Sequence, residues 1–312
     1  MKLVLAGDDD KRARDRQAHA AWGARLSVDE YVAREERLRA QSWARAAMAT
    51  WFLRGDDEQL LASCETYRMD GWRRGQRGDV WGVASVFTEE ALRGRGHATA
   101  LIDRLLERAR AAGVVASVLY SDVGPRQYER SGYRARPAED LLFTPLAGAA
   151  DNGVDALVGD GEPLAEIAAP TDEDFIVWPT AAQLDWHVER TRTYAALLRR
   201  PALPSIGARA GAGQIRWAVD WKSDSLKVTL LATARGDEAA ALVQAARRTA
   251  AALALREVRL WAQPWPFDVA AALERSLDGS RVARPDSLPM LAPLLPALAA
   301  ESWRQIPRAV WV

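Results

Sequence analysis

Residues 93–98, RGRGHA, place two glycines between arginines just before a stretch with helical periodicity. The first amides of a helix have no partner within the helix and carry a partial positive charge, which suits a phosphate group. Glycine allows the backbone to approach such an anion closely. The stretch therefore predicts a diphosphate-binding turn, whose members are Arg93, Gly94, Arg95, Gly96, His97, Ala98 and Thr99. A plain surface turn that carries solvated arginines is the alternative interpretation.

Two other phosphate-binding motifs do not fit these residues. A dinucleotide-binding fingerprint would need a third glycine where Thr99 stands. A P-loop would need a lysine after its last glycine, where this chain has His97. The turn therefore has to be interpreted from the elements that flank it.

Alternating strands and helices must position this turn. Apolar runs and turn residues in the first half predict strands over 2–6, 42–53, 60–69, 80–87, 114–121 and 141–146, with a loop over 72–79. Helices are expected over 9–22, after the Ser27–Glu30 capping box, over 96–112 and over 124–132. The turn at 93–98 would therefore connect a strand to an amphipathic helix.

The second half has the same alternating character. Small residues and glycine at 147–162 indicate a linker, and the elements beyond it are helices over 181–200 and 237–254, a hairpin of 215–221 with 226–233, and a strand at 258–262. We expect an α/β fold class in two parts, a catalytic domain over 1–148 and a C-terminal α/β domain over 163–312. The apolar, proline-broken tail from 285 is expected to be packed.

Composition narrows the possible functions. The chain has 312 residues, with 42 basic and 42 acidic side chains, and this balance argues against nucleic-acid and membrane-surface proteins, which depend on a positive field. The one cysteine, Cys64, excludes an intrachain disulfide and a multi-cysteine zinc site, and its apolar neighbours predict a buried strand thiol. No metal is expected. The lack of a signal peptide and of a membrane-spanning run favours the cytoplasm.

The turn and its flanks resemble the GNAT superfamily of acetyl-CoA-dependent N-acetyltransferases. Residues 93–98 are similar to the family's Q/R-x-x-G-x-G/A signature, and residues 128–133, YERSGY, to its Y-x-x-x-G-F/Y motif. The runs at 80–87 and 114–121 stand where the family has its fourth and fifth strands. The resemblance covers residues 42–146 and implies a splayed, mixed central sheet with acetyl-CoA as the co-substrate.

A narrower resemblance covers both halves of the chain. VLYSDVG followed by QYERSGY, together with VWPTAAQLDWHVER in the second half, is similar to the fungal lysine acetyltransferases of lysine degradation. Those proteins join a GNAT domain to a distinctive C-terminal domain. The resemblance implies free L-lysine as the acceptor and a C-terminal domain that contributes to the acceptor site.

Acetyl transfer to an amine needs an uncharged amine, a donor for the developing oxyanion and an acid for the leaving thiolate. The resemblance implies that main-chain amides near Val86, Phe87 and Thr88 supply the oxyanion donor. The motif makes Tyr128 the candidate acid, and a packing aromatic is the alternative. Glu65 and Asp122 are candidate bases, acting directly or through water, and each is otherwise a surface carboxylate.

A cationic amine acceptor would need acidic residues. In LDWHVER, Asp185 and Glu189 are four residues apart and share a helical face, with His187 between them. The two carboxylates could hold an ammonium group, and Arg190 could hold a carboxylate. The alternative for these charged residues is an amphipathic helix whose charges are solvated, and the alternative for His187 is a hydrogen-bonded histidine of the core. Tryptophans could wall an acceptor channel, and those of the second half include Trp178, Trp186, Trp217, Trp221, Trp261 and Trp265.

These observations predict an N-acetyltransferase that acts on a primary amine of a small molecule, with the side-chain amine of free L-lysine first. An aminoglycoside, a polyamine or a protein amine is the alternative acceptor. A CoA-binding regulatory module without turnover and an interaction protein with an incidental RGRG loop are alternatives of other classes. The protein is expected to be a monomer or a homodimer.

Overall fold

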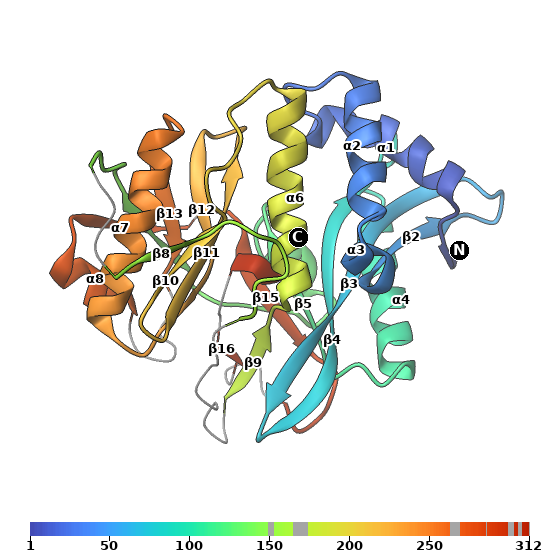
Figure 1. The fold of residues 1–312 in the computed structure, drawn as a ribbon. Helices are drawn as coiled ribbons and strands as arrows, with labels where there is room; N and C mark the ends of the chain where they lie inside the picture. Colours follow the sequence, from blue (N-terminus) through green and yellow to red (C-terminus); the bar gives the residue numbers. More distant parts are fainter. Residues whose placement is uncertain are drawn as a thin grey trace.

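Two sheets with helices packed around them form the molecule in a computed structural model, which describes residues 1–148, 153–164, 174–262, 269–284, 286–298, 303–304 and 308–311. The N-terminal elements and the first sheet occupy the right of Figure 1, and the second sheet with its helices occupies the left. The predicted α/β architecture, a mixed central sheet followed by further α/β structure, is confirmed.

The first sheet has the strand order β1-β2-β3-β4-β5-β15-β6, with β9 paired to β3 and β16 paired to β9. Its strands are β1 (Lys2–Leu5), β2 (Met48–Arg54), β3 (Leu60–Arg73), β4 (Gln76–Phe87), β5 (Ala116–Ser121), β6 (Arg134–Ala135), β9 (Phe175–Trp178), β15 (Leu288–Pro293) and β16 (Trp303–Arg304). Strand β3 is antiparallel to both β2 and β4, whereas β4 and β5 are parallel.

Strands β4 and β5 separate toward their carboxyl ends. They pair only from Val80 with Ala116 to Val83 with Leu119, although β4 continues to Phe87. Just beyond the last pair, β4 carries an extra residue against β3, and Ser85 adopts a φ of 51°. A bulge of this kind bends a strand and ends its regular pairing, so it explains the separation. The predicted splay of the sheet is therefore present.

Helices α1 (Asp8–Trp22) and α2 (Val28–Arg39) follow the sequence prediction closely, and α2 begins at the reciprocal Ser27–Glu30 capping box. Helices α4 (His97–Ala111) and α5 (Arg126–Glu129) also form where they were predicted. The described helices include none long and apolar enough to cross a bilayer.

Two local predictions in the first half need correction. Residues 42–53 were predicted to hold a strand, which forms as β2, but it begins only at Met48 because helix α3 (Ser42–Ala47) precedes it and buries Trp43 and Ala44 in the core. Residues 72–79 were expected to be a loop, but the β3–β4 ladder runs through them to the pair Arg73–Gln76. Arg74 and Gly75 both have positive φ, which is typical of a two-residue type I′ hairpin turn. The arginines and glycines of this segment therefore indicate a tight turn of two residues and not an eight-residue loop.

The second sheet has the strand order β14-β7-β13-β12-β11-β10-β8. Its strands are β7 (Glu139–Phe143), β8 (Asp155–Leu157), β10 (Gly207–Ala210), β11 (Gly213–Asp220), β12 (Ser225–Ala232), β13 (Glu257–Trp261) and β14 (Gly279–Ala283), and the helices of this half are α6 (Ala181–Leu197), α7 (Gly236–Ala252) and α8 (Val269–Ser276). The predicted hairpin of β11 with β12 is confirmed.

Each sheet contains a strand from the other half of the sequence. The strand predicted to close the first half forms as β7, but it lies between β13 and β14 of the second sheet. In return β15, from the apolar tail, lies between β5 and β6 of the first sheet. The tail is therefore packed as expected, and its core residues Met290 and Leu291 are fully buried.

Helix α6 lies between the two halves of the molecule (Figure 1). It contacts α2 and α3 on one side and β11 on the other, and a short C-terminal 3-10 helix, η3 (Arg308–Val310), also packs on it. Trp186 of α6 reaches the core of the first half, where its ring lies 5.6 Å from that of Trp43. One face of α6 is therefore available to a site built by the first sheet.

Candidate active site

The predicted phosphate turn connects the end of β4 to the start of α4. Gly94 and Gly96 have φ values of 77° and 80°, and Gly96 is the N-cap of the helix. The first intrahelical bond runs from the Ala100 amide to the Gly96 carbonyl at 3.0 Å. The amides of His97, Ala98 and Thr99 therefore have no acceptor within the helix and can serve an anion.

A cavity of about 750 Å³ opens over this turn. Its lining contains every residue predicted to contact the co-substrate except the exposed Arg95: Val86, Phe87, Thr88, Arg93, Gly94, Gly96, His97, Ala98 and Thr99. Arg126 and Arg130 of the α5 region also line it and add positive charge. A large anionic ligand fits both this size and this charge.

A second cavity, of about 300 Å³, adjoins the first across the splay of β4 and β5. The two cavities share Trp22, Val86, Val123 and Tyr128 in their linings. The second cavity, called the acceptor cavity below, also contains Glu65, Asp122 and residues of α2 and α6. Tyr128, Glu65 and Asp122, which were predicted from separate parts of the sequence, are thus brought together around one cavity.

Tyr128 stands at the junction of the two cavities. Its side chain is nearly buried, with 7% of the residue surface exposed, and its hydroxyl has no hydrogen-bond partner among the described residues. Burial, with smaller contributions from Cys64 and Asp122, raises the pKa of Tyr128 to about 12. The hydroxyl therefore stays protonated near neutral pH and can donate a proton. Cys64 itself is buried on β3, as predicted.

Glu65 lies on β3 opposite the β4 bulge and is held by two arginines. Its Oε1 atom lies 3.4 Å from Nη1 of Arg14 and 3.6 Å from Nη1 of Arg39. Burial alone would raise the pKa of this carboxyl, but the two arginines outweigh it and hold the pKa below its ordinary value. Glu65 is therefore an ionised carboxylate at neutral pH.

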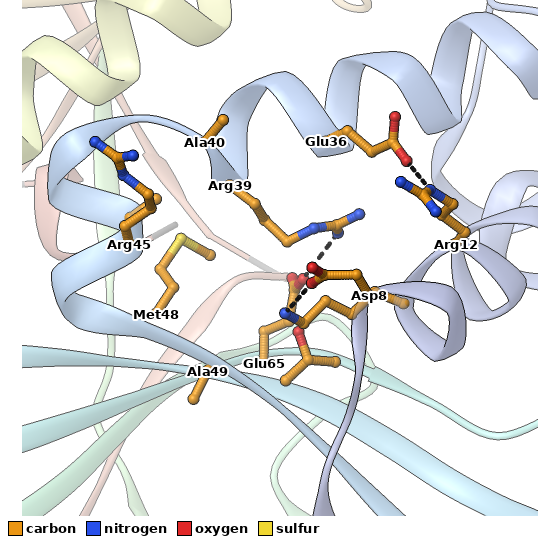
Figure 2. A pocket seen from close by; sticks show the side chains of 12 residues that line it. Asp8, Arg12, Glu36, Arg39, Ala40, Arg45, Met48, Ala49 and Glu65 are labelled. Atoms are coloured by element: carbon orange, nitrogen blue, oxygen red, sulfur yellow. Dashed lines mark hydrogen bonds and ion pairs between the residues drawn. The ribbon is translucent and has the colours of Figure 1, made fainter.

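Glu65 also lines a third cavity, of about 590 Å³, formed by α1, α2, α3 and β2 (Figure 2). Most of the charges there are paired with one another. Lys11 pairs with Asp8. Figure 2 shows the pairs of Arg12 with Glu36 and of Arg39 with Glu65. These ion pairs neutralise most of the charged groups of this cavity. Glu65 and Met48 line both this cavity and the acceptor cavity, so the two cavities adjoin at these residues.

Asp122 follows the end of β5. Its Oδ1 atom accepts hydrogen bonds from both the amide and the hydroxyl of Ser287, each at 3.0 Å. Ser287 directly precedes β15, so the tail strand that completes the first sheet also fixes this carboxylate. The second oxygen of Asp122 is left for the acceptor cavity.

The structure does not bring Asp185 and Glu189 to the acceptor cavity. Asp185 accepts hydrogen bonds from Arg216 and from the Gly161 amide, both at 2.8 Å, and Glu189 pairs with Arg37 at 2.7 Å. The cavity is lined instead by Trp186 and Arg190, one residue further along α6 in each case. Successive residues of a helix are rotated by about 100° around its axis. The face of α6 that carries Trp186 and Arg190 therefore meets the cavity, and the face that carries the two carboxylates does not.

His187 is fully buried on a different face of α6. Its Nε2 atom lies 2.9 Å from the carbonyl oxygen of Ala309, and burial lowers its pKa to about 3. It lines a small cavity of about 150 Å³ that shares Arg190, Lys222 and Trp311 with the acceptor cavity. The arrangement is that of a neutral histidine hydrogen-bonded to the backbone of η3.

This burial predicts a pH dependence of stability. An unfolded histidine takes up a proton below a pH of about 6.5, whereas folded His187 stays neutral down to about 3. Burial of neutral His187 therefore costs no stability above a pH of about 6.5. As the pH falls from about 6.5 toward about 3, the free energy of unfolding should decrease by up to about 1.4 kcal/mol per pH unit, because only the unfolded chain takes up the proton. Urea titrations at several pH values should show this slope, and His187→Gln should flatten it. A matched His19→Gln variant should keep the slope, and equal slopes in all three proteins would contradict the assignment.

Sequence reasoning missed several residues of the acceptor cavity. Arg14, Arg34, Lys222 and Trp311 come from four separate segments, and nothing in their local sequence marks them. The tryptophan prediction applies to Trp186, which lines the cavity, whereas Trp217 and Trp221 are buried in the core of the second half. Trp265 lies outside the described residues.

Two protein-family models match this chain, one in each half. Residues 16–136 match the acetyltransferase (GNAT) domain, and residues 162–296 match the LYC1 GNAT-like C-terminal domain. The first match contains β4, the phosphate turn, α4 and Tyr128, and the second contains α6 and the β11–β12 hairpin. The first cavity is lined by residues of the first match alone, whereas the acceptor cavity is lined by residues of both matched regions.

Individual relatives agree with these matches. The lysine acetyltransferase of Yarrowia lipolytica is 21% identical to this chain, in an alignment that covers 78% of this chain and 78% of that protein. A probable N-acyltransferase from Enterococcus faecalis superposes with a TM-score of 0.62 at 12% identity, over 94% of this chain and 72% of that chain. A GCN5-related N-acetyltransferase from Kribbella flavida gives 0.52 at 19% identity, over 94% and 72%.

Proposed function

We propose, from the premise that this chain belongs to the GNAT superfamily of acetyltransferases, that it transfers the acetyl group of acetyl-CoA to the side-chain amine of free L-lysine. The observation that carries the proposal is the junction at Tyr128. There a cavity that begins at a helix N-terminus adjoins a smaller cavity that contains carboxylates. A thioester and an amine that entered from the two sides would meet at this point.

The co-substrate side uses main-chain groups. The amides of residues 97–99 would bind the diphosphate, with Arg93 nearby. The Arg93 Nε atom donates to the Thr88 carbonyl at 3.1 Å, which ties the turn to the end of β4. Because the bulge at Ser85 frees this end of β4 from β5, an amide near Val86–Thr88 can face the thioester carbonyl and stabilise its oxyanion.

The reaction consumes a protonated amine and acetyl-CoA and yields an amide, free CoA thiol and one proton. The ammonium must lose a proton before its nitrogen attacks the carbonyl, and the resulting tetrahedral intermediate collapses by breaking the carbon–sulfur bond. The leaving thiolate then takes a proton from the Tyr128 hydroxyl, which burial keeps protonated. The nitrogen's second proton returns to the tyrosine through solvent or a carboxylate.

The two carboxylates are proposed to have different roles. Glu65 is ionised and held by Arg14 and Arg39, so it is a weak proton acceptor and a good electrostatic partner for an ammonium group. Asp122 has one oxygen bound by Ser287 and one left for the cavity. We assign Asp122 the removal of the amine proton, through a water molecule.

Free L-lysine is supported by the relative from Yarrowia lipolytica, which is named a lysine acetyltransferase, and by the match of the C-terminal half. The size of the acceptor cavity, about 300 Å³, is at the lower end of small-molecule sites and suits an amino acid better than an aminoglycoside. The C-terminal half supplies Trp186, Arg190, Lys222 and Trp311 to it.

The test is an acetyl-transfer assay with a panel of amines. The protein is mixed with acetyl-CoA and L-lysine, a polyamine, an aminoglycoside or a lysine-containing peptide, and free thiol is measured together with the acetylated product. Lysine is expected to give the highest kcat/KM. Stabilisation by CoA without thiol release for any amine would favour a regulatory module, and no response to CoA would overturn both.

A further inference from the structure

The acceptor cavity contains more positive than negative groups, which is unexpected for a site that receives an ammonium ion. Its lining has four cationic side chains, Arg14, Arg34, Arg190 and Lys222, and three carboxylates, Glu35, Glu65 and Asp122. Arg14 forms an ion pair with Glu65, in which its Nη1 atom lies 3.4 Å from Oε1. The other three cations are the unexplained part of the cavity.

Arg34 is a buried guanidinium with free donors. Only 5% of the residue is exposed, and its Nε and Nη1 atoms have no hydrogen-bond partner in the described part of the chain, although Nη2 pairs with Glu35. The rings of Tyr31 and Tyr194 lie 4.8 Å and 4.6 Å from its central carbon. These rings fix the guanidinium plane, and two buried, unpaired donors are costly unless a ligand accepts from them.

Arg190 and Lys222 bring two further positive charges to the same cavity. Arg190 lies over the Trp186 ring at 5.9 Å, and none of the described carboxylates is within ion-pair distance of it. The Nζ atom of Lys222 donates to the Trp22 carbonyl, which leaves its charge unneutralised by that contact. Burial, with the neighbouring Arg190 and Arg34, lowers the pKa of Lys222 to about 8. Although Arg34 pairs with Glu35, Arg190 and Arg34 still repel the Lys222 ammonium, and a bound anion would relieve this repulsion.

We infer that Arg34, Arg190 and Lys222 form a subsite for a carboxylate of the acceptor. The inference rests on the acetyl-transfer function proposed above and adds to it the residues that would recognise the acceptor's carboxylate, a group that free L-lysine carries and simple amines lack. Planar guanidinium donors bind a carboxylate through paired hydrogen bonds, and the lysine adds a point charge. A polyamine or an aminoglycoside, which is cationic throughout, would meet three positive charges with no group to offer them.

Pairs of amines that differ only in the carboxylate test the subsite directly. L-Lysine is compared with cadaverine, L-ornithine with putrescine, and 6-aminohexanoate with pentylamine, and kcat/KM is measured for each. We expect each carboxylate-bearing amine to exceed its partner by about 100-fold, the effect of losing a charged hydrogen-bonded contact. Equal values within the pairs would overturn the subsite while leaving acetyl transfer intact.

Arg190→Gln tests the contribution of one cation. The ratio of kcat/KM for L-lysine to that for cadaverine should fall by about 10-fold or more, with the affinity for CoA unchanged. Arg192→Gln is the matched control, because Arg192 lies on the same helix but pairs with Asp160 at 2.8 Å outside the cavity lining. That variant should keep the wild-type ratio.

Lys222→Met provides a second reading, since this side chain comes from the β11–β12 turn and not from α6. It should lower the same ratio, and circular dichroism should confirm that both variants are folded. A wild-type ratio in both folded variants would remove the assignment. If no amine is acetylated although CoA binds, the proposed function fails, and this outcome differs from loss of selectivity among acetylated amines.

Discussion

Replacement of Gly96 by glutamate is expected to abolish coenzyme A binding while the protein remains folded. A Cβ atom at this position would meet no heavy atom within 4 Å, so the side chain has room, and only the φ of 80° opposes it. The new carboxylate would lie beside the amides of His97, Ala98 and Thr99 and would compete with a diphosphate for them. Because each charged hydrogen bond contributes about 1.5–3 kcal/mol, loss of two corresponds to at least about 100-fold weaker binding. Isothermal titration with CoA measures this change.

Gly113→Glu is the matched control for backbone strain. Gly113 follows the other end of α4, has a φ of 75°, and a Cβ atom added to it would likewise meet no heavy atom within 4 Å. Both substitutions should therefore lower the melting temperature to a similar extent, since a side chain at positive φ costs about 1 kcal/mol. CoA affinity should change only in the Gly96 variant. A folded Gly96→Glu protein that binds CoA as tightly as the wild type would contradict the assignment of the turn.

Replacement of Tyr128 by phenylalanine is expected to reduce kcat by about 10²–10⁴ while the affinity for CoA changes little. The hydroxyl is the only group removed, and it stands at the junction of the two cavities without a hydrogen-bond partner among the described residues. Its loss therefore leaves no buried group unpaired, and the ring continues to pack against Tyr133. Steady-state kinetics together with CoA titration separate the two effects.

Tyr133→Phe is the control for a tyrosine that packs in the same core. Its hydroxyl lies 2.7 Å from the Ser117 hydroxyl and is fully buried, so its removal should lower stability by about 1 kcal/mol and leave kcat unchanged. The contrast between the two variants is diagnostic, because they delete the same atom from neighbouring rings. If Tyr128→Phe behaves like Tyr133→Phe, Tyr128 is a packing residue and another group protonates the thiolate.

The sequence was a good guide wherever the determinants are local. The capping box at Ser27 and Glu30 fixes the start of α2, and the positive-φ glycines of the RGRG turn fix the start of α4. Residues 42–53 show the limit of such reasoning, because an apolar pattern that suits a strand also suits a short helix. There the packing of Trp43 against Tyr67 and Trp186 decides for the helix.

The acceptor residues show a stronger limit. The pair Asp185–Glu189 had the right chemistry and spacing for an ammonium site, but a helix has several faces, and only its neighbours determine which face meets a cavity. Here Arg216 and Arg37 take the two carboxylates, and α2 with the first sheet faces Trp186 and Arg190. A helical pattern alone cannot distinguish faces that differ by one residue.

The sequence by itself therefore determined the glycine-rich turn that opens α4, the order of the elements around it and the resemblance to the GNAT superfamily, because these depend on contiguous residues and on backbone conformations that glycine permits. The tertiary structure alone decided that β7 and β15 are exchanged between the sheets, that Ser287 holds Asp122, and that Arg34, Arg190 and Lys222 share one cavity. These contacts join segments that are distant in the sequence, and Ser287 and Asp122 are 165 positions apart. Their formation depends on how buried surfaces and charges are satisfied in the whole fold, and no local pattern records that outcome.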